Sequence, residues 1–323
     1  MSSAPIIVRA RAAVTMCGRP IDNAAVAICG GTIIAVGKWN EVRASNPGEV
    51  TDLGELVLMP GLINAHCHLD YTCMRGSIQP PQSFTAWVRE INEEKSALRS
   101  EDYITSVAEG FVEALSFGTT TVCNLEAFAA LIGQMPLPPM RMWWFAEMLD
   151  VRHAIEPEEI YSQIKAVSPI RGGIGLAPHA PFTASIELYR AAAAVAQRHR
   201  LPLTTHLAES REEMQMFRDG EGALFEFLRS IGRSMSDCGQ STPLQLLLNA
   251  GVLDERWIVA HLNELTSEDF LRLESSPRFH VAHCPRSHAY FAHERFSLRQ
   301  LRRLGSTSAS GLTASPVTRT SAC

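Results

Sequence analysis

The stretch Met59-Pro60-Gly61-Leu62-Ile63-Asn64-Ala65-His66-Cys67-His68 leads from an apolar segment directly into two imidazole side chains. Residues 57–65 are predicted to form a buried strand that is interrupted at Pro60-Gly61. His66 and His68 are two positions apart, so in an extended chain both imidazoles leave the same face. Two imidazoles that converge in this way suit zinc or a similar divalent metal. For an isolated pair the simpler interpretation is two polar residues that end a strand, and the downstream sequence decides between the two.

The length and composition of the chain predict one large and one small domain. The 323 residues exceed the usual size of a single domain, although an α/β barrel alone takes about 250 residues. The apolar content of 46% is sufficient for a core, and the charged content of 20% excludes wholesale disorder. A net charge of −5 with scattered Lys and Arg residues predicts no nucleic-acid or membrane partner and favours a small molecule.

The cysteines and the N-terminal segment favour the cytoplasm. The eight cysteines form no C-x-x-C pair, which predicts reduced thiols in a cytosolic protein. Residues 1–13 contain no apolar block of signal-peptide length, and no window reaches the ~18 apolar residues of a membrane span. We therefore expect a soluble, cytoplasmic protein.

Residues 1–57 alternate apolar and polar positions in short runs, which predicts a small β domain. One run covers residues 6–10, and Gly30-Gly31 separates the runs 24–29 and 32–36, as in a tight hairpin. A segment of this length buries little apolar surface alone. We therefore expect it to be one part of a β-sandwich that is completed elsewhere.

From residue 58 to residue 305 the pattern changes to strands that alternate with helical stretches, which is typical of βα units around a parallel sheet. The seven strand candidates are Val57–Ala65, Thr119–Asn124, Met140–Met148, Gly173–Pro178, Leu201–His206, Trp257–His261 and Phe279–His283. The helix candidates are Phe84–Leu98, Glu101–Phe117, Pro157–Ala166, Ile186–Arg200, Gly222–Gly232, Thr242–Ala250, Ser267–Ser275 and Leu298–Leu304. This order predicts an α/β barrel.

Side chains with metal-binding or acid–base chemistry recur where these predicted strands end. They are His66 and His68, Asn124 and Glu126, Glu147, His179, His206 with Glu209, His261, and His283. In a parallel barrel these strand ends share one face, on which the active site is built. A single histidine of this kind is more often structural, but five of the seven strands end in histidine, which indicates a common site.

His66, His68 and His206 are the predicted ligands of one metal ion. Three protein ligands leave a coordination position for water, whose pKa falls to about 7 on Zn²⁺. Glu209 is predicted to take a proton from this water and to pass it to the leaving group. His261 is predicted to orient the hydroxide or to stabilise the addition intermediate. The alternatives are a solvated residue that opens the next helix for Glu209, and a structural strand-end residue for His261.

Four further residues are candidates for substrate contact. His179 ends the segment 176–179, which contains no lysine that could be carbamylated to bridge two metals, so a single metal is expected. His179 is therefore assigned to substrate binding. His283, Arg286 and His288 are candidate pocket residues after the seventh predicted strand, with a structural role as the alternative for each.

Taken in order, these motifs resemble the amidohydrolase superfamily. The segments that carry the resemblance are Pro60–His68, His179-Ala180-Pro181-Phe182-Thr183, His206-Leu207-Ala208-Glu209 and the histidines of the sixth and seventh predicted strands. More narrowly, residues 20–305 resemble its adenosine-type aminohydrolase and chlorohydrolase group, which includes S-adenosylhomocysteine deaminase and aminodeoxyfutalosine deaminase.

The resemblance implies a fold and a division of roles. The fold is a (β/α)8 TIM barrel with a split β-sandwich made from both chain ends, and the activity is hydrolytic deamination of a purine-like ring. The implied metal ligands are His66, His68 and His206. The implied proton shuttle is Glu209, and the implied catalytic histidine is His261.

The sequence departs from this family after Gly305. The family's fourth metal ligand is an aspartate at the end of strand eight, in a motif like Gly-Thr-Asp-Ser, and residues 306–323 contain no aspartate. Twelve of these 18 residues are Ser, Thr or Ala, which predicts neither a buried strand nor the returning half of the sandwich. One permitted coding of residues 306–319, with a single base restored in front, encodes Ile-Asn-Val-Cys-Leu-Gly-Thr-Asp-Ser. We therefore predict a truncating frameshift after Gly305, a barrel that lacks its eighth strand, an aberrant tail over residues 306–323, and impaired activity.

The predicted function is that of a metal-dependent hydrolase of non-peptide C–N bonds that deaminates an adenine-like ring. The expected cofactor is one divalent metal ion, with zinc preferred and iron, cobalt or nickel as alternatives, because three imidazoles accept all of them. The expected partner is a small, purine-nucleoside-like substrate, and the resemblance suggests a homo-oligomer. The alternatives are a chlorohydrolase of a chlorinated heterocycle and an inactive metal-binding relic.

Overall fold

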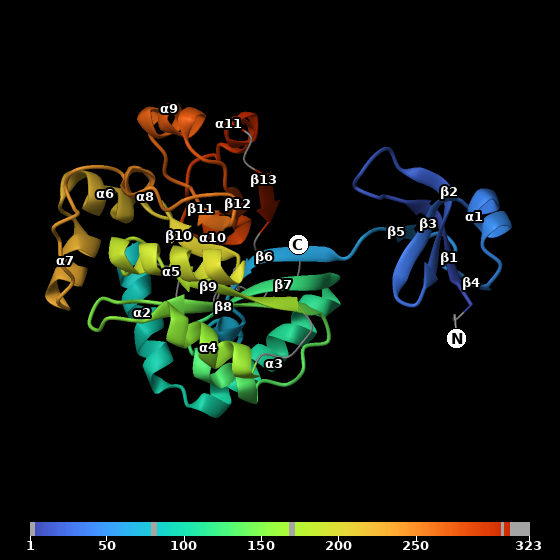
Figure 1. The fold of residues 1–323 in the computed structure, drawn as a ribbon, viewed down its shortest axis with the longest axis horizontal. Helices are drawn as coiled ribbons and strands as arrows, with labels where there is room; N and C mark the ends of the chain where they lie inside the picture. Colours follow the sequence, from blue (N-terminus) through green and yellow to red (C-terminus); the bar gives the residue numbers. More distant parts are fainter. Residues whose placement is uncertain (1–3, 79–82, 168–171, 305–306, 311–323) are drawn as a thin grey trace. The chain divides into compact units, whose positions relative to one another are not determined.

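The computed structural model describes residues 4–78, 83–167, 172–304 and, as backbone, 307–310. The chain divides into two compact units, Met1–Leu62 and Ile63–Cys323 (Figure 1). Among the helices in these described ranges, none combines the length and the apolar composition that a membrane span needs.

The first unit is a small mixed sheet with one helix. Its elements are β1 (Ile6–Ala13), β2 (Ile21–Cys29), β3 (Thr32–Lys38), α1 (Trp39–Ser45), β4 (Glu49–Asp52) and β5 (Val57–Leu58). The strand order is β3-β2-β1-β4, and β5 also pairs with β1. The predicted hairpin is confirmed: Gly30 and Gly31 turn the chain with φ of 57° and 80°, values that favour glycine. Ile7, Ala25, Ala27 and Val42 form the core of this unit.

The second unit is a nearly closed parallel barrel, which confirms the predicted fold class. Its strands are β6 (Leu62–Cys67), β7 (Thr119–Glu126), β8 (Arg141–Met148), β9 (Gly172–Pro178), β10 (Leu203–Leu207), β11 (Trp257–His261) and β12 (His280–His283). They follow one another in the sheet in chain order. The predicted interruption at Pro60-Gly61 is confirmed, because these two residues separate β5 from β6, which belong to different sheets.

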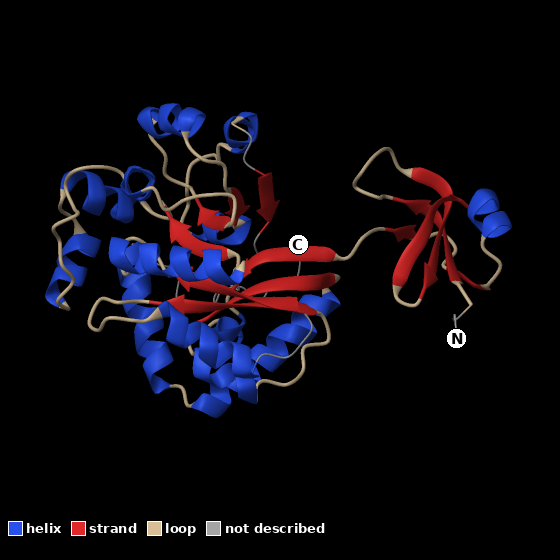
Figure 2. Ribbon diagram, viewed as in Figure 1, coloured by secondary structure: helices blue, strands red, loops and turns tan. Residues whose placement is uncertain are grey.

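Helices lie on the outer side of the barrel strands (Figure 2). The α-helices are α2 (Phe84–Ala97), α3 (Ser100–Ser116), α4 (Pro157–Val167), α5 (Ile186–His199), α6 (Arg211–Asp219), α7 (Ala223–Ser230), α8 (Pro243–Ala250), α9 (Ser267–Ser275), α10 (Pro285–Tyr290) and α11 (Leu298–Arg303). Two short 3-10 helices, η1 (Leu69–Met74) and η2 (Ala129–Gln134), follow β6 and β7. The eight predicted helices are confirmed, whereas α1, α6 and α10 were not predicted.

Several of these helices begin at a serine or threonine whose side chain accepts a backbone N–H. Ser83, Ser185 and Ser210 cap α2, α5 and α6 in this way, and Thr242 and Thr266 cap α8 and α9. Large apolar residues such as Trp144 and Trp257, both 0% exposed, fill the space between strands and helices. The strand ends are thereby held in fixed positions.

A short strand occupies the eighth position of the sheet. β13 (Thr307–Ser310) pairs in parallel with β12, with His280 opposite Thr307 and His283 opposite Ser310. The composition of the Ser/Thr/Ala-rich tail did not predict this pairing. The rest of that tail, residue 306 and residues 311–323, lies outside the described residues.

Candidate metal centre and active site

His66 and His68 stand where β6 ends and η1 begins. The His66 ring is completely buried, and among the described residues neither of its ring nitrogens has a hydrogen-bond partner. The His68 side chain is also buried, at 4% exposure. Burial, followed by the charges of neighbouring histidines, holds the pKa of both imidazoles well below the ordinary 6.5. Both rings are therefore neutral at pH 7, which is the form that binds a metal.

His206 of β10 has a defined tautomer. Its Nδ1 lies 2.8 Å from the backbone oxygen of His179, and because a carbonyl can only accept, Nδ1 carries the proton. Its Nε2 therefore presents a lone pair, and it lies 3.1 Å from Nε2 of His68. Burial, and then the charge of His179, lowers the pKa of His206 to about 4.

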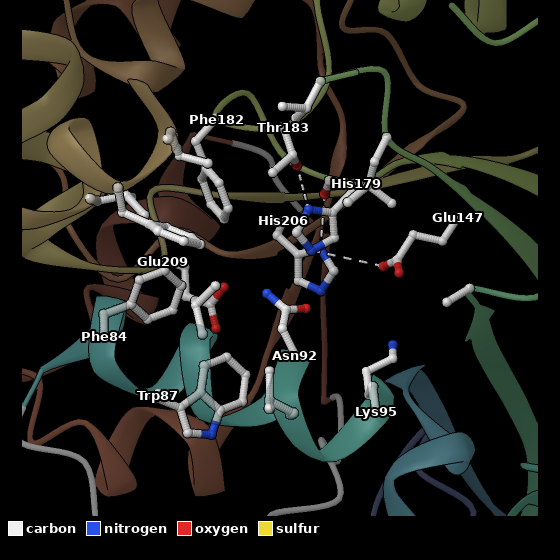
Figure 3. Close-up of a pocket in the computed structure, with 18 of the residues that line it drawn as sticks. Phe84, Trp87, Asn92, Lys95, Glu147, His179, Phe182, Thr183, His206 and Glu209 are labelled. Atoms are coloured by element: carbon white, nitrogen blue, oxygen red, sulfur yellow. Dashed lines mark hydrogen bonds and ion pairs between the residues drawn. The ribbon is translucent and has the colours of Figure 1, made fainter. Parts of the chain in front are cut away.

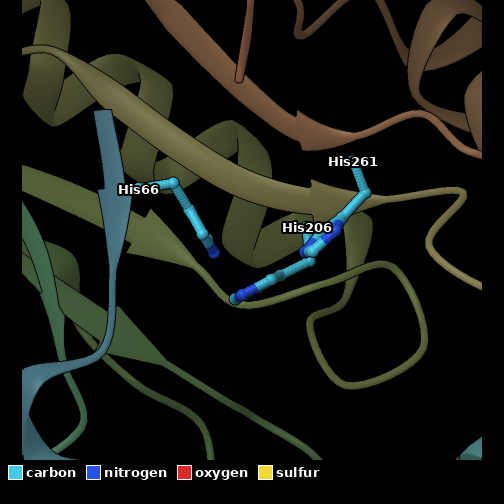
Figure 4. Close-up of side chains that lie close together, drawn as sticks. All are labelled: His66, His206 and His261. Atoms are coloured by element: carbon cyan, nitrogen blue, oxygen red, sulfur yellow. The ribbon is translucent and has the colours of Figure 1, made fainter. Parts of the chain in front are cut away.

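Two overlapping groups of side chains have ligand atoms within 4.8 Å of one another. One is His66, His206 and His261, whose rings are directed towards one another (Figure 4). The other is His68, Glu147 and His206. The three predicted ligands also gather, because the ring centroids of His66, His68 and His206 are 4.7 to 5.2 Å apart. Neutral, buried imidazoles whose nitrogen atoms gather around one point are suitable ligands for a divalent metal ion.

Glu209 and His261 meet beside these histidines. Oε1 of Glu209 lies 3.3 Å from Nε2 of His261, without the alignment of a hydrogen bond. Burial, and then the charge of Glu213, raises the pKa of Glu209 to about 8, so its carboxyl is mainly protonated at pH 7. The pKa of His261 is held well below 6.5 by burial and by the neighbouring histidines. A protonated acid thus faces a neutral imidazole.

The backbone around these two residues is held in an uncommon conformation. Ala208, His261 and Leu262 have φ of 49°, 73° and 51°, in the left-handed region that non-glycine residues rarely adopt. This turn lets Leu262 and Asn263 donate their N–H groups to Leu207 and Ala208 at 2.9 and 3.0 Å. The loops after β10 and β11 are therefore tied together.

Glu213 of α6 fixes the same loop from the other side. Its carboxylate oxygens accept the N–H groups of Ala208 at 3.1 Å and of Glu209 at 2.7 Å. Asn263 adds a bond from Nδ2 to the carbonyl of Glu209 at 3.1 Å. Glu209 is therefore not a solvated helix opener, since its side chain is buried and its backbone N–H and carbonyl are each held by a hydrogen bond.

A cavity of about 710 Å³ opens onto this group of polar side chains (Figure 3). His68, Glu147, His179, His206, Glu209 and His261 line one part of it. Aromatic and aliphatic side chains line the remainder, including Phe84, Trp87, Ile91, Phe182, Phe227 and Phe291. A lining that is aromatic in one part and polar in the other suits a ligand with an apolar ring and a polar group.

Of the predicted substrate contacts, His179 lines this cavity, and its Nδ1 lies 2.5 Å from Oγ1 of Thr183. His283, Arg286 and His288 are not among the residues that line it. The His283 ring instead stacks on Phe296 at a centroid distance of 3.9 Å, and His288 lies 5.3 Å from His293. A role for these three residues in binding stays a prediction.

Sequence reasoning missed the wall that α2 contributes to the cavity. Phe84, Trp87, Ile91, Asn92 and Lys95 all line the cavity from this helix. Their spacing of three or four residues is that of one helical face, and this periodicity was the available signal.

Lys95 is the cationic member of this wall. Its Nζ lies 3.5 Å from Oδ2 of Asp70 and 4.8 Å from the centre of the Tyr71 ring. Burial works against its charge, but Tyr71, Asp70 and Glu147 together raise the pKa of Lys95 above its ordinary value. Burial raises the pKa of Asp70 to about 6, although the Lys95 charge lowers it. A stable positive charge therefore stands at the edge of the cavity.

Residues 57–311 match the family model described as the amidohydrolase family. The chain belongs to the amidohydrolase family. A relative in Pyrococcus furiosus, named 5-methylthioadenosine/S-adenosylhomocysteine deaminase, is 29% identical over 289 residues. That match takes in 85% of this chain and 62% of the Pyrococcus protein, so the chain spans less than two thirds of its relative.

Solved structures of two deaminases share this fold. The Helicobacter pylori aminofutalosine deaminase in complex with methylthio-coformycin superposes with a TM-score of 0.81 at 18% identity, over 95% of this chain and 76% of that one. A Xanthomonas campestris adenosine deaminase with bound zinc gives a TM-score of 0.75 at 21% identity, over 96% of this chain and 69% of that one. At these identities the likeness concerns the fold alone.

Proposed function

We propose that this chain is a metal-dependent hydrolase that deaminates an adenine-like ring. The observation that carries the proposal is the buried Glu209 carboxyl 3.3 Å from His261, beside buried histidines at the polar part of an aromatic cavity. The amidohydrolase membership and the deaminase name of the Pyrococcus relative support it.

We assign His66, His68 and His206 as the ligands of a single divalent metal, with zinc preferred. When bound, the metal supplies Lewis acidity that brings the pKa of water to about 7. The His206 Nδ1–H bond to the His179 carbonyl orients the His206 ring, so that its lone pair points into the centre. Burial keeps all three imidazoles neutral and available.

Glu209 is the proton carrier of this proposal. Ammonia is a poor leaving group unless it is protonated, and a carboxyl with a pKa of about 8 holds a proton at pH 7 that it can give to the departing amine. The loop bonds from Glu213 and Asn263 hold this carboxyl at one place. His261, neutral and 3.3 Å away, orients the attacking oxygen and the carboxyl.

The aromatic part of the cavity binds the substrate. Phe84, Trp87 and Phe182 present rings that can pack against a purine, and Phe84 and Phe182 meet edge to face at 6.0 Å. A purine-nucleoside-like substrate is therefore proposed, in a cytoplasmic protein. Homo-oligomer formation is part of the same proposal.

The test is ammonia release in single-turnover experiments with the zinc-loaded chain. The substrates are adenosine, 5-methylthioadenosine and S-adenosylhomocysteine, and the variant is Glu209→Gln. We expect ammonia from at least one of them, and a rate about 10²- to 10⁴-fold lower in the variant. Glu159→Gln, which changes an exposed glutamate of α4, is the matched control and should leave the rate unchanged.

Two outcomes would overturn this proposal. If a folded, metal-loaded chain releases no ammonia from any of the three nucleosides, the deaminase activity is rejected. If the chain releases chloride from a chlorinated triazine and Glu209→Gln keeps that rate, the chlorohydrolase alternative replaces it, because chloride leaves without a proton.

A further inference from the structure

Glu147, the next-to-last residue of strand β8, carries a buried carboxyl side chain that the proposed mechanism does not use. Its side chain is only 5% exposed, and among the described residues its Oε1 accepts no hydrogen bond. The neighbouring buried carboxylate Glu126 differs, because its oxygens accept from the Phe128 N–H at 3.1 Å and from Asn124 Nδ2 at 3.4 Å. A buried carboxylate oxygen without a donor is costly, so Glu147 calls for a cation or a donor that the described part of the chain does not supply.

The imidazole that faces Glu147 cannot be that donor. Nε2 of His179 lies 3.9 Å from Oε1 of Glu147, which is too long for a hydrogen bond (Figure 3). Nδ1 of His179 is engaged by the Thr183 hydroxyl at 2.5 Å. In either tautomer of His179, the 3.9 Å separation leaves Oε1 of Glu147 without a hydrogen bond from this ring.

Lys95 does not fill this gap either. Its Nζ forms its ion pair with Oδ2 of Asp70 at 3.5 Å, and no described residue, Lys95 included, donates a hydrogen bond to Oε1 of Glu147.

The second neighbour of Glu147 is the pair formed by His68 and His206. Their Nε2 atoms are 3.1 Å apart, and a carboxylate oxygen of Glu147 lies within 4.8 Å of a ring nitrogen of each. Two imidazoles bound to one tetrahedral zinc at about 2.0 to 2.1 Å place their nitrogens roughly 3.3 Å apart. The observed spacing of the two nitrogens is close to that of ligands on one metal ion.

We propose that Glu147 is a ligand of the metal and completes the set formed by His68 and His206. The inference rests on the metal centre of the proposed function and adds a carboxylate to a set that was otherwise made of neutral imidazoles. A carboxylate partly neutralises a divalent cation, which stabilises the cation in a buried site. Residues 306–323 contain no Asp, Glu or His, so the segment that includes β13 offers no carboxylate for this purpose.

The test is metal affinity of the full chain after the bound metal has been removed by a chelator. Co²⁺ is titrated into the natural chain and into Glu147→Gln, and its visible absorption reports both affinity and coordination. We expect Glu147→Gln to bind Co²⁺ at least about tenfold more weakly and with a changed absorption band. Glu126→Gln is the matched control, because it removes a buried carboxylate at the end of the adjacent strand β7 and should leave the band unchanged.

The two proposals fail in distinguishable ways. If the natural chain and Glu147→Gln bind Co²⁺ equally while His206→Ala does not bind, the metal centre stands and the role of Glu147 is rejected. If the folded natural chain binds no Co²⁺, both proposals are rejected.

A measurement on the natural chain covers the case in which Glu147→Gln does not fold. In a crystal structure of the cobalt-loaded chain, a Glu147 oxygen about 2.0 to 2.2 Å from the metal supports the inference. A separation longer than about 3.5 Å overturns it.

Discussion

At the scale of the residue, the site combines bases without protons and an acid that keeps its proton. His206 points a lone pair inward because its other nitrogen is bonded to a carbonyl at 2.8 Å. Glu209 retains its proton because it is buried beside the carboxylate of Glu213. Burial therefore lowers the pKa of the imidazole and raises the pKa of the carboxyl. Both shifts favour acid–base catalysis near pH 7.

The same burial predicts how the stability of the metal-free chain depends on pH. The pKa of Glu209 and of Glu126 is about 8 in the folded chain against an ordinary 4.5, so from pH 4.5 to 8 the folded chain binds more protons. The free energy of unfolding that these two carboxyls contribute therefore falls as pH rises. The fall is about 1.4 kcal/mol per pH unit for each proton that the folded chain retains. The buried histidines, including His206 with a pKa of about 4, act in the opposite direction up to about pH 7.5, because their imidazoles take up protons only on unfolding.

We therefore expect the urea midpoint of the metal-free chain to fall between about pH 7.5 and pH 8, where unfolded imidazoles are mainly neutral and the carboxyls dominate. Glu209→Gln should show a smaller fall, because the amide does not titrate. A midpoint that is constant or rises over this interval, in both proteins, would show that these carboxyls are ionised in the folded chain.

The role of Glu147 shows the limit of sequence reasoning at this scale. The sequence placed Glu147 at a strand end, and the structure gives it a buried side chain within reach of His68 and His206. Distances between side chains on different strands depend on barrel closure and on side-chain rotamers, which spacing along the chain does not encode. The histidines were found more easily, because they recur at successive strand ends.

At the scale of the element, α2 depends on a residue from another helix. Glu212 of α6 accepts the N–H of Phe84 at 2.7 Å and of Thr85 at 3.1 Å, and it also accepts the hydroxyl of Thr85. A carboxylate at the first turn satisfies backbone donors that have no partner in the helix and interacts well with its dipole. Glu212 thus positions the helix that provides one wall of the cavity.

Glu212→Ala should weaken both the helix and substrate binding. We expect the free energy of unfolding to fall by about 1 to 2 kcal/mol, as for loss of a helix cap. We also expect KM to rise with a smaller change in kcat, because Phe84 and Trp87 move while Glu209 stays in place. Steady-state kinetics and urea unfolding measure the two effects.

The control for this variant is Glu187→Ala. Glu187 is also a first-turn glutamate, in α5, but its side chain is 82% exposed and its ion pair with Arg190 is long, at 4.0 Å. Its loss should change stability by less than about 0.5 kcal/mol. An unchanged KM in Glu212→Ala would show that α2 does not set the cavity wall.

Helices and strands were predicted well where the apolar residues follow one regular spacing along the sequence. The barrel strands read as continuous apolar runs because both faces are covered, and β11 was predicted with its observed ends, Trp257 and His261. α6 was missed because it is short and charged, although the pair Ser210 and Glu213 has the spacing of a helix N-terminus. β13 was missed because its pairing with β12 is a tertiary contact and not a local preference.

At the scale of the whole molecule, the open question is what the segment after Gly305 contributes to the barrel. The backbone of Thr307–Ser310 pairs with β12, so the eighth position is occupied. The composition of residues 306–323 nevertheless contains no acidic side chain for the metal centre. The frameshift hypothesis predicts that the gene, with one base restored after codon 305, encodes a strand that ends in Gly-Thr-Asp-Ser.

This hypothesis makes a joint prediction for sequence and activity. The bases that encode residues 306–319 should read as that strand in the neighbouring frame, and a protein with the restored frame should deaminate at least about tenfold faster, because a charged group is returned to the reacting centre. Replacing the restored aspartate by asparagine should remove this gain. Incompatible bases would reject the frameshift, and equal turnover by both proteins would show that the aspartate is dispensable.

If Glu147 binds the metal in the present chain, Glu147→Gln should weaken Co²⁺ binding less in the restored protein, because a second carboxylate then shares the cation.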